Sequence, residues 1–107
     1  MARSLGTATI AVLAALQSHV RYGLDITERT GLQPATVYTS LRRLEKRGFV
    51  QGRWEDAEIA EAERRPRRRY YELTVDGEHA LHEAARKLGK FALGVAGFSP
   101  GTGKTDS

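Results

Sequence analysis

The chain of 107 residues contains no cysteine. Disulfides, thiolate metal sites and cysteine nucleophiles are therefore excluded, which fits a reducing compartment. Metal binding would rest on three histidines, His19, His79 and His82. His79 and His82 are spaced to share a helical face, but no third ligand accompanies them. No nucleophile–base pair or carboxylate cluster stands out either, so we expect no metal, no cofactor and no enzymatic activity.

Long apolar runs are also missing. The longest, from Ala8 to Leu16, follows Arg3 in the manner of a signal peptide but is far shorter than the ~20 residues that cross a bilayer. Four apolar residues recur at helical spacing from this run onward, with polar residues between them. They are Ile10, Leu13, Leu16 and Val20. The pattern favours an amphipathic first helix over a signal peptide. We expect a cytoplasmic protein with no membrane association.

A phosphate-binding loop is absent as well, although "GTGKT" at residues 101–105 resembles the end of one. Such a loop needs a glycine five residues before the Gly103-Lys104 pair, and that position is Phe98. No buried strand precedes it. Nucleotide binding is not expected.

Positive charge exceeds negative charge only mildly, with a net charge of +4, so the placement of the charges matters more than their number. Residues 55–63 read "EDAEIAEAE", and residues 64–69 read "RRPRRR". Averaged together, this segment looks neutral. Its arginines could form a localisation signal, pair with the acidic half of the segment, or contact DNA, where arginine is favoured by its permanent charge and planar donor fork.

The elements that follow the first helix predict a helix-turn-helix. A second helix is expected from Tyr22 to Thr30, closed by Gly31 in a left-handed conformation. Pro34 suits the first position of a third helix, which ends at Gly48. Gln33 is a poor cap, so packing is expected to hold the start of this helix.

Two aromatic-rich runs, residues 49–54 and 69–73, predict a β-hairpin whose connection of about 14 residues is unusually long. Thr74 is expected to cap a last helix that runs to about Val95. The fold class is thus α+β and mostly helical: a winged helix-turn-helix of three helices, a two-stranded β-wing and a C-terminal dimerisation helix. We expect a DNA-binding domain at 1–73, the dimerisation helix at 74–95 and a flexible tail at 96–107.

The outward face of the third helix is the first candidate site. If Val37, Leu41 and Leu44 point inward, the opposite face is small near its start and basic further along, which suits a major groove. A solvated basic face is the alternative. The residues of this face, with Tyr38 at its edge, are Ala35, Thr36, Thr39, Arg42, Arg43 and Lys46.

The last helix carries an apolar stripe that extends beyond what a small three-helix core would cover. Its predicted dimer-interface residues are Leu81, Ala84, Leu88, Phe91 and Val95. Pairing of this stripe with a second copy would make a homodimer. Packing over the first helix of the same chain is the alternative.

Several motifs occur in an order that resembles the PadR family of bacterial winged-helix regulators: "TVY", "LRRLE", "GFV", "RPRRRYY" and "LTVDG". The resemblance runs from about Tyr22 to Leu81. It implies a homodimeric repressor of a palindromic operator in double-stranded DNA, with the third helix in the major groove and the hairpin as wing. It assigns DNA contacts on the third helix to Tyr38, Arg42 and Arg43. On the wing it assigns them to Arg65, Arg67 and Arg68.

This chain departs from the family at Ala35, often glycine, and at Thr39, often proline, so an operator sequence should not be transferred. The resemblance also leaves a small-molecule effector possible but unknown. Trp54 could line its pocket between subunits, although a core or wing-base role is favoured. The alternative to a DNA-binding regulator is a winged helix that serves as a protein-interaction module.

Overall fold

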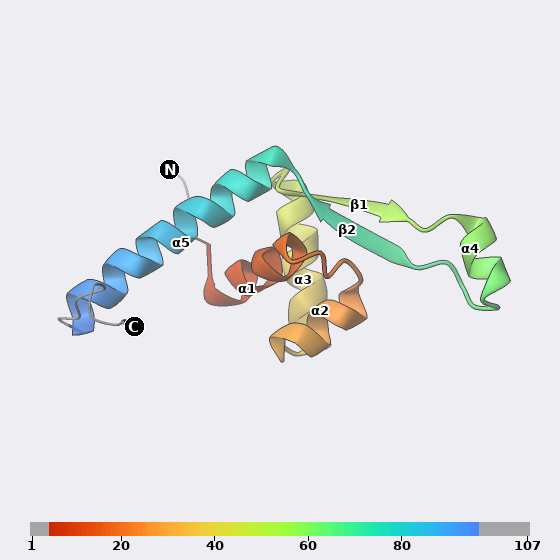
Figure 1. Cartoon of the computed structure of the whole chain (residues 1–107), viewed down its shortest axis with the longest axis horizontal. Helices are drawn as coiled ribbons and strands as arrows, with labels where there is room; N and C mark the ends of the chain where they lie inside the picture. The colour runs from red at the N-terminus through yellow and green to blue at the C-terminus, as the bar shows by residue number, and fades with distance from the viewer. Residues whose placement is uncertain (1–4, 97–107) are drawn as a thin grey trace, which may run out of the picture.

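The computed structural model describes residues 5–96, with side chains to residue 90. Figure 1 shows a central group of helices from which a β-hairpin and a long helix extend in opposite directions. The elements in chain order are α1 (Thr7–Gln17), α2 (Gly23–Thr30), α3 (Pro34–Lys46), β1 (Val50–Trp54), α4 (Ala57–Ala62), β2 (Arg69–Leu73) and α5 (Val75–Ala96). The predicted α+β fold with a two-stranded wing is confirmed.

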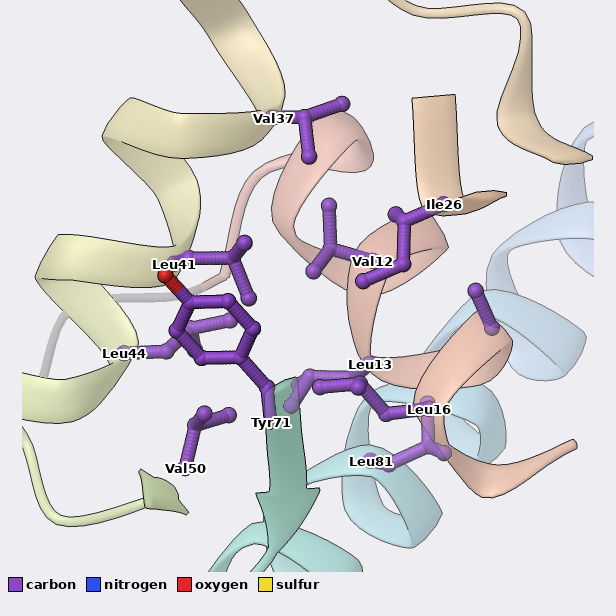
Figure 2. Packing of buried hydrophobic residues seen from close by; sticks show 11 residues of the cluster. Val12, Leu13, Leu16, Ile26, Val37, Leu41, Leu44, Val50, Tyr71 and Leu81 are labelled. Carbon is purple, nitrogen blue, oxygen red and sulfur yellow. The ribbon is translucent and has the colours of Figure 1, made fainter. Parts of the chain in front are cut away.

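The core lies where α1 and α3 pack against each other, with α2, the hairpin and α5 closing its sides. The predicted inward stripe of α3 is confirmed, because Val37, Leu41 and Leu44 are at most 1% exposed. Figure 2 shows the Tyr71 ring of β2 reaching toward Leu41 and Leu44. The other labelled core side chains are Val12, Leu13, Leu16, Ile26, Val50 and Leu81. One apolar cluster therefore holds the helices and the wing together.

Both ends of α3 follow the sequence closely. Pro34 occupies the first turn and Gln33 provides no side-chain cap, so the packing of Val37 anchors this end. At the other end Gly48 has φ 78°, a left-handed conformation that glycine adopts without penalty. The N–H of Phe49 donates to the Leu44 carbonyl at 2.9 Å and completes the helix stop.

The start of α2 differs from the expectation by one residue, since the helix begins at Gly23 and not at Tyr22. Tyr22 is extended because it forms a β-bridge with Tyr70, and the N–H of Tyr71 donates to the Arg21 carbonyl at 2.9 Å. The connection between α1 and α2 thus pairs with the edge of β2. Gly31 closes α2 with φ 73°, as predicted.

The hairpin is antiparallel, with Val50 opposite Leu73 and Trp54 opposite Arg69. The long connection expected between the two strands contains a short helix, α4, which lies at the far end of the wing (Figure 1). Arg64, with φ 54°, ends α4, and the N–H of Arg65 donates to the Ala60 carbonyl at 3.1 Å. Alanine and glutamate in "AEIAEA" were the sequence signal for this helix.

Thr74 joins the wing to α5 and caps the helix as predicted. Its hydroxyl accepts a hydrogen bond from the N–H of Gly77 at 3.0 Å and donates to the Gly48 carbonyl at 2.7 Å. Its own N–H donates to the Phe49 carbonyl at 3.1 Å. The end of α3 and the starts of the wing and α5 therefore meet at one hydrogen-bonded junction.

Candidate nucleic-acid interface

The α3 face predicted to meet DNA is open to solvent. Ala35, Tyr38, Arg42, Arg43 and Lys46 are exposed, while Thr36 and Thr39 are half-buried. The three basic side chains lie toward the C-terminal half of the helix, which leaves smaller residues near its start. A small N-terminal half allows the helix backbone to approach base edges, and a basic half suits phosphates or guanine.

Tyr38 has a packing role as well as an exposed edge. The side chain is 41% exposed. Its ring lies so close to the backbone of α2 at Gly23 that any side chain at Gly23 would overlap it. Tyr38 therefore fixes the distance between the two helices of the helix-turn-helix while its outer edge remains accessible.

The start of α1 borders this face of α3. An open groove of about 460 Å³ lies between the two helices, and hydroxyl groups line both walls. Thr7 and Thr9 come from α1, and Thr36 and Thr39 come from α3, with Arg43 at the side. Hydroxyls and a guanidinium on a concave surface are groups that bind phosphate oxygens.

The three wing arginines predicted to contact DNA differ in their surroundings. Arg65, predicted to contact DNA, is bound to Glu55 through two hydrogen bonds, from Nη1 at 2.6 Å and from Nη2 at 2.8 Å. Glu55 is only 4% exposed. The hydrogen bonds from Arg65 lower the pKa of Glu55 to about 2, against desolvation, which acts in the opposite direction. Arg65 thus follows the alternative of internal pairing with the acidic half of the segment.

Arg67 and Arg68 remain exposed on the second half of the same segment. The Nε of Arg67 donates to the Glu55 carbonyl at 2.8 Å, which leaves its terminal nitrogens for other partners. Arg68 stacks over the Tyr22 ring, 4.4 Å from its centroid, and Tyr22 in turn packs edge-on against Tyr70. Both cations are therefore held at the outer end of the strands by contacts with a carbonyl and an aromatic ring, which leave their charges in place.

Arg69 and Trp54 form a second stack that sequence reasoning did not assign. The Arg69 guanidinium lies 5.5 Å from the centroid of the Trp54 ring, and its Nη2 binds Glu45 of α3 at 3.2 Å. Trp54 is 56% exposed, so it belongs to the wing and not to the core. The cross-strand pairing of positions 54 and 69 was the signal, but it needs the hairpin register.

The predicted dimer-interface residues divide along α5. Leu81 is 6% exposed and packs in the core of its own chain. Ala84 is half-buried and Leu88 is 50% exposed. The Phe91 and Val95 side chains lie outside the described part of the chain, as do Phe98 and the "GTGKT" segment. The first turns of α5 therefore cover α1, which was the alternative, whereas Leu88 lies beyond that contact.

Within residues 5–96, no cluster of three or more histidine, aspartate or glutamate side chains is arranged to hold a metal ion. No helix in the same range has the length and apolar character needed to span a membrane.

A basic α3 that follows α2 across a tight turn, with an arginine-bearing hairpin beside it, defines a winged helix-turn-helix of the transcriptional regulator class. The chain belongs to the transcriptional regulator PadR-like family, whose model matches residues 12–83. This class consists of regulators and not of enzymes. No curated protein matches the chain in sequence.

Solved structures with the same fold include a PadR family regulator from Clostridium difficile R20291, with 24% identity and a TM-score of 0.69 over 84% of this chain and 94% of that one. The PcaV regulator from Streptomyces coelicolor, solved with its natural ligand, has 21% identity and a TM-score of 0.74 over 92% of this chain and 67% of that one. BpsR from Bordetella bronchiseptica, whose DNA binding is regulated by 6-hydroxynicotinic acid, has 27% identity and a TM-score of 0.65 over 91% of this chain and 70% of that one.

Proposed function

We propose that this protein is a sequence-specific, DNA-binding transcriptional repressor that acts as a homodimer. In this proposal α3 enters the major groove and the wing contacts the sugar-phosphate backbone. The observation that carries it is the exposed basic end of α3, formed by Arg42, Arg43 and Lys46, directly opposite a fully buried apolar stripe. A helix fixed on one side and basic on the other presents its cations at defined positions.

The wing supports the proposal through two further exposed cations, Arg67 and Arg68. The Glu55 carbonyl anchors the guanidinium of Arg67, and the Tyr22 ring anchors that of Arg68. Anchored arginines lose less conformational freedom on binding than free ones do. We assign them to phosphates, where contacts set position and register and do not read sequence.

The proposed dimer implies a palindromic operator, because two-fold symmetry in the protein is matched by two-fold symmetry in the DNA. Leu88 is a large apolar side chain left 50% exposed on α5, and α5 continues away from the helical core (Figure 1). Covering this part of α5 with the same part of a second copy would bury that side chain. We place the dimer seam at Ala84, Leu88, Phe91 and Val95.

The test is binding of the purified protein to duplexes selected from genomic fragments, measured over a range of salt concentrations. We expect one selected duplex to bind far more tightly than bulk DNA. The logarithm of affinity should fall with the logarithm of salt concentration, by about 0.9 for each phosphate contacted. Binding that never exceeds that of bulk DNA would favour the alternative, a winged helix that recognises another protein.

A further inference from the structure

A buried carboxylate lies at the outer end of the two strands, in a wing whose proposed partner is a polyanion. Glu55 follows β1 and is 4% exposed. A buried charge is costly unless it is paired and hydrogen-bonded, so the contacts of Glu55 should explain why a carboxylate occupies this place. Simple electrostatics gives no reason for it, since a negative charge at this place opposes DNA binding.

The contacts of Glu55 reach three residues of the "RRPRRR" segment. Its carboxylate accepts the two bonds from Arg65 described above and a third from the N–H of Arg68 at 3.2 Å. Its backbone N–H donates to the Arg68 carbonyl at 2.8 Å, and its carbonyl accepts from Arg67 Nε. One residue thus fixes the segment that carries both exposed wing cations.

The path of the chain depends on the same contacts. At Arg64 the backbone turns through a left-handed conformation, with φ 54°, which residues other than glycine adopt at a cost. This turn reverses the chain after α4 and returns Arg65 to Glu55. The ion pair offsets the unfavourable turn and holds the start of the arginine segment in place.

We propose that Glu55 is the positioning residue of the wing and that Arg65 serves inside this clamp and not on DNA. The clamp consists of Glu55, Arg65, Arg67 and Arg68. It sets the positions from which Arg67 and Arg68 meet the phosphates. This inference rests on the proposed DNA-binding function and adds the internal support of that surface.

The proposal has an unusual sign, which makes it testable. Replacing a glutamate with a neutral residue raises the net charge of the protein, and a simple charge argument then expects tighter DNA binding. The clamp predicts weaker binding, because two phosphate contacts lose their positions. The matched control is Glu58, an exposed glutamate on α4 in the same wing.

The experiment compares wild-type protein with Glu55→Gln, Glu55→Ala and Glu58→Gln on the duplex that the wild type selects. At about 0.15 M salt, we expect both Glu55 variants to bind on the order of tenfold more weakly, with a salt slope reduced by about 1 to 2. Glu58→Gln should bind as tightly as the wild type or slightly more tightly. Circular dichroism confirms folding, and Glu55→Gln retains the size of the side chain and an acceptor if Glu55→Ala does not fold.

Arg65→Gln, alone and with Glu55→Gln, separates the clamp from a direct contact. If Arg65 works only through Glu55, the double variant should bind no more weakly than either single variant. If Arg65 contacts a phosphate, its loss should weaken binding independently. Wild-type selectivity combined with unchanged or tighter binding by the Glu55 variants would overturn the clamp and leave the DNA-binding proposal intact. A wild type that selects no duplex would remove the proposed function itself.

Discussion

Gly77, in the first turn of α5, lies against the backbone of Phe49, the residue that leads into the hairpin. A side chain here would overlap the Phe49 carbonyl oxygen, a backbone atom that already accepts the N–H of Thr74. Gly77→Ala should therefore lower the free energy of unfolding by about 1 to 3 kcal/mol, as overpacking does. Urea denaturation measures this change.

Gly89 on the same helix provides the control, because a methyl group there meets nothing within 4 Å. Gly89→Ala should raise the free energy of unfolding by roughly 0.5 to 1 kcal/mol, since alanine favours a helix over glycine. Equal effects at the two positions would contradict the close contact at Gly77.

Glu55 gives the fold a defined dependence on pH. Its pKa in the folded protein is about 2, against an ordinary value of 4.5, chiefly because Arg65 donates hydrogen bonds to it. A carboxyl whose pKa is lowered on folding stabilises the fold above its unfolded pKa, and that contribution is lost as the pH falls toward the folded pKa. The stabilisation should thus be complete above about pH 5 and largely gone near pH 2.

Thermal unfolding of wild type and Glu55→Gln over this range measures the effect. The difference in Tm should be constant from neutral pH to about pH 5 and should close below that. A difference that persists unchanged to about pH 2 would show that the charge of Glu55 contributes nothing.

The sequence predicted the burial of residues that follow helical periodicity, but it did not predict which charged residues would pair with each other. The buried stripe Val37, Leu41 and Leu44 follows from helical spacing alone. The fate of the five arginines in "RRPRRR" does not, since nothing local distinguishes Arg65 from its neighbours. Arg65 is set apart by a partner ten residues away, which is reached only after α4 and a left-handed turn.

At the scale of elements, α3 and the wing should divide the work of DNA binding. Arg43→Ala should weaken binding to the selected duplex by about 1 to 3 kcal/mol and relax its sequence preference, if the side chain reads a base. Arg67→Ala and Arg68→Ala should weaken selected and bulk DNA alike and reduce the salt slope by about 1 each. Competition binding at several salt concentrations distinguishes the two patterns.

Arg86 is the control for this comparison. It is exposed on α5, pairs with Glu83 and lies outside the proposed interface. Arg86→Ala removes the same charge and should leave the salt slope unchanged. A slope that falls equally for Arg86, Arg67 and Arg68 would indicate a general effect of net charge.

The elements themselves were predictable except for α4. Capping and breaker residues mark α2, α3 and the start of α5, and aromatic runs mark the strands. A helix of six residues is not stable alone, whatever its composition. It is held by Ala60, 2% exposed, and by the turn at Arg64, which are tertiary features that local propensity does not contain.

For the whole molecule, the proposed dimer makes Leu88 a sensitive position. Leu88→Glu should place a charge in the seam and shift the protein toward the monomer, because a buried unpaired charge is costly. Val75→Glu is the control, since Val75 is 66% exposed at the opposite end of α5. Sedimentation velocity at several concentrations measures both. A Leu88→Glu protein that sediments as the wild type does would move the seam elsewhere.

The junction at Thr74 has a mechanical consequence for such a dimer. Gly48 ends α3, Phe49 leads into the wing and Thr74 precedes α5, and hydrogen bonds join all three without an intervening flexible linker. A dimer built on α5 would therefore hold its two α3 helices at a fixed separation and orientation. One base pair inserted between half-sites turns one of them by roughly 35° about the duplex axis. Two α3 helices that cannot rotate relative to each other could not both bind their half-sites on such a duplex. The protein would therefore select operators by half-site spacing as strictly as by sequence.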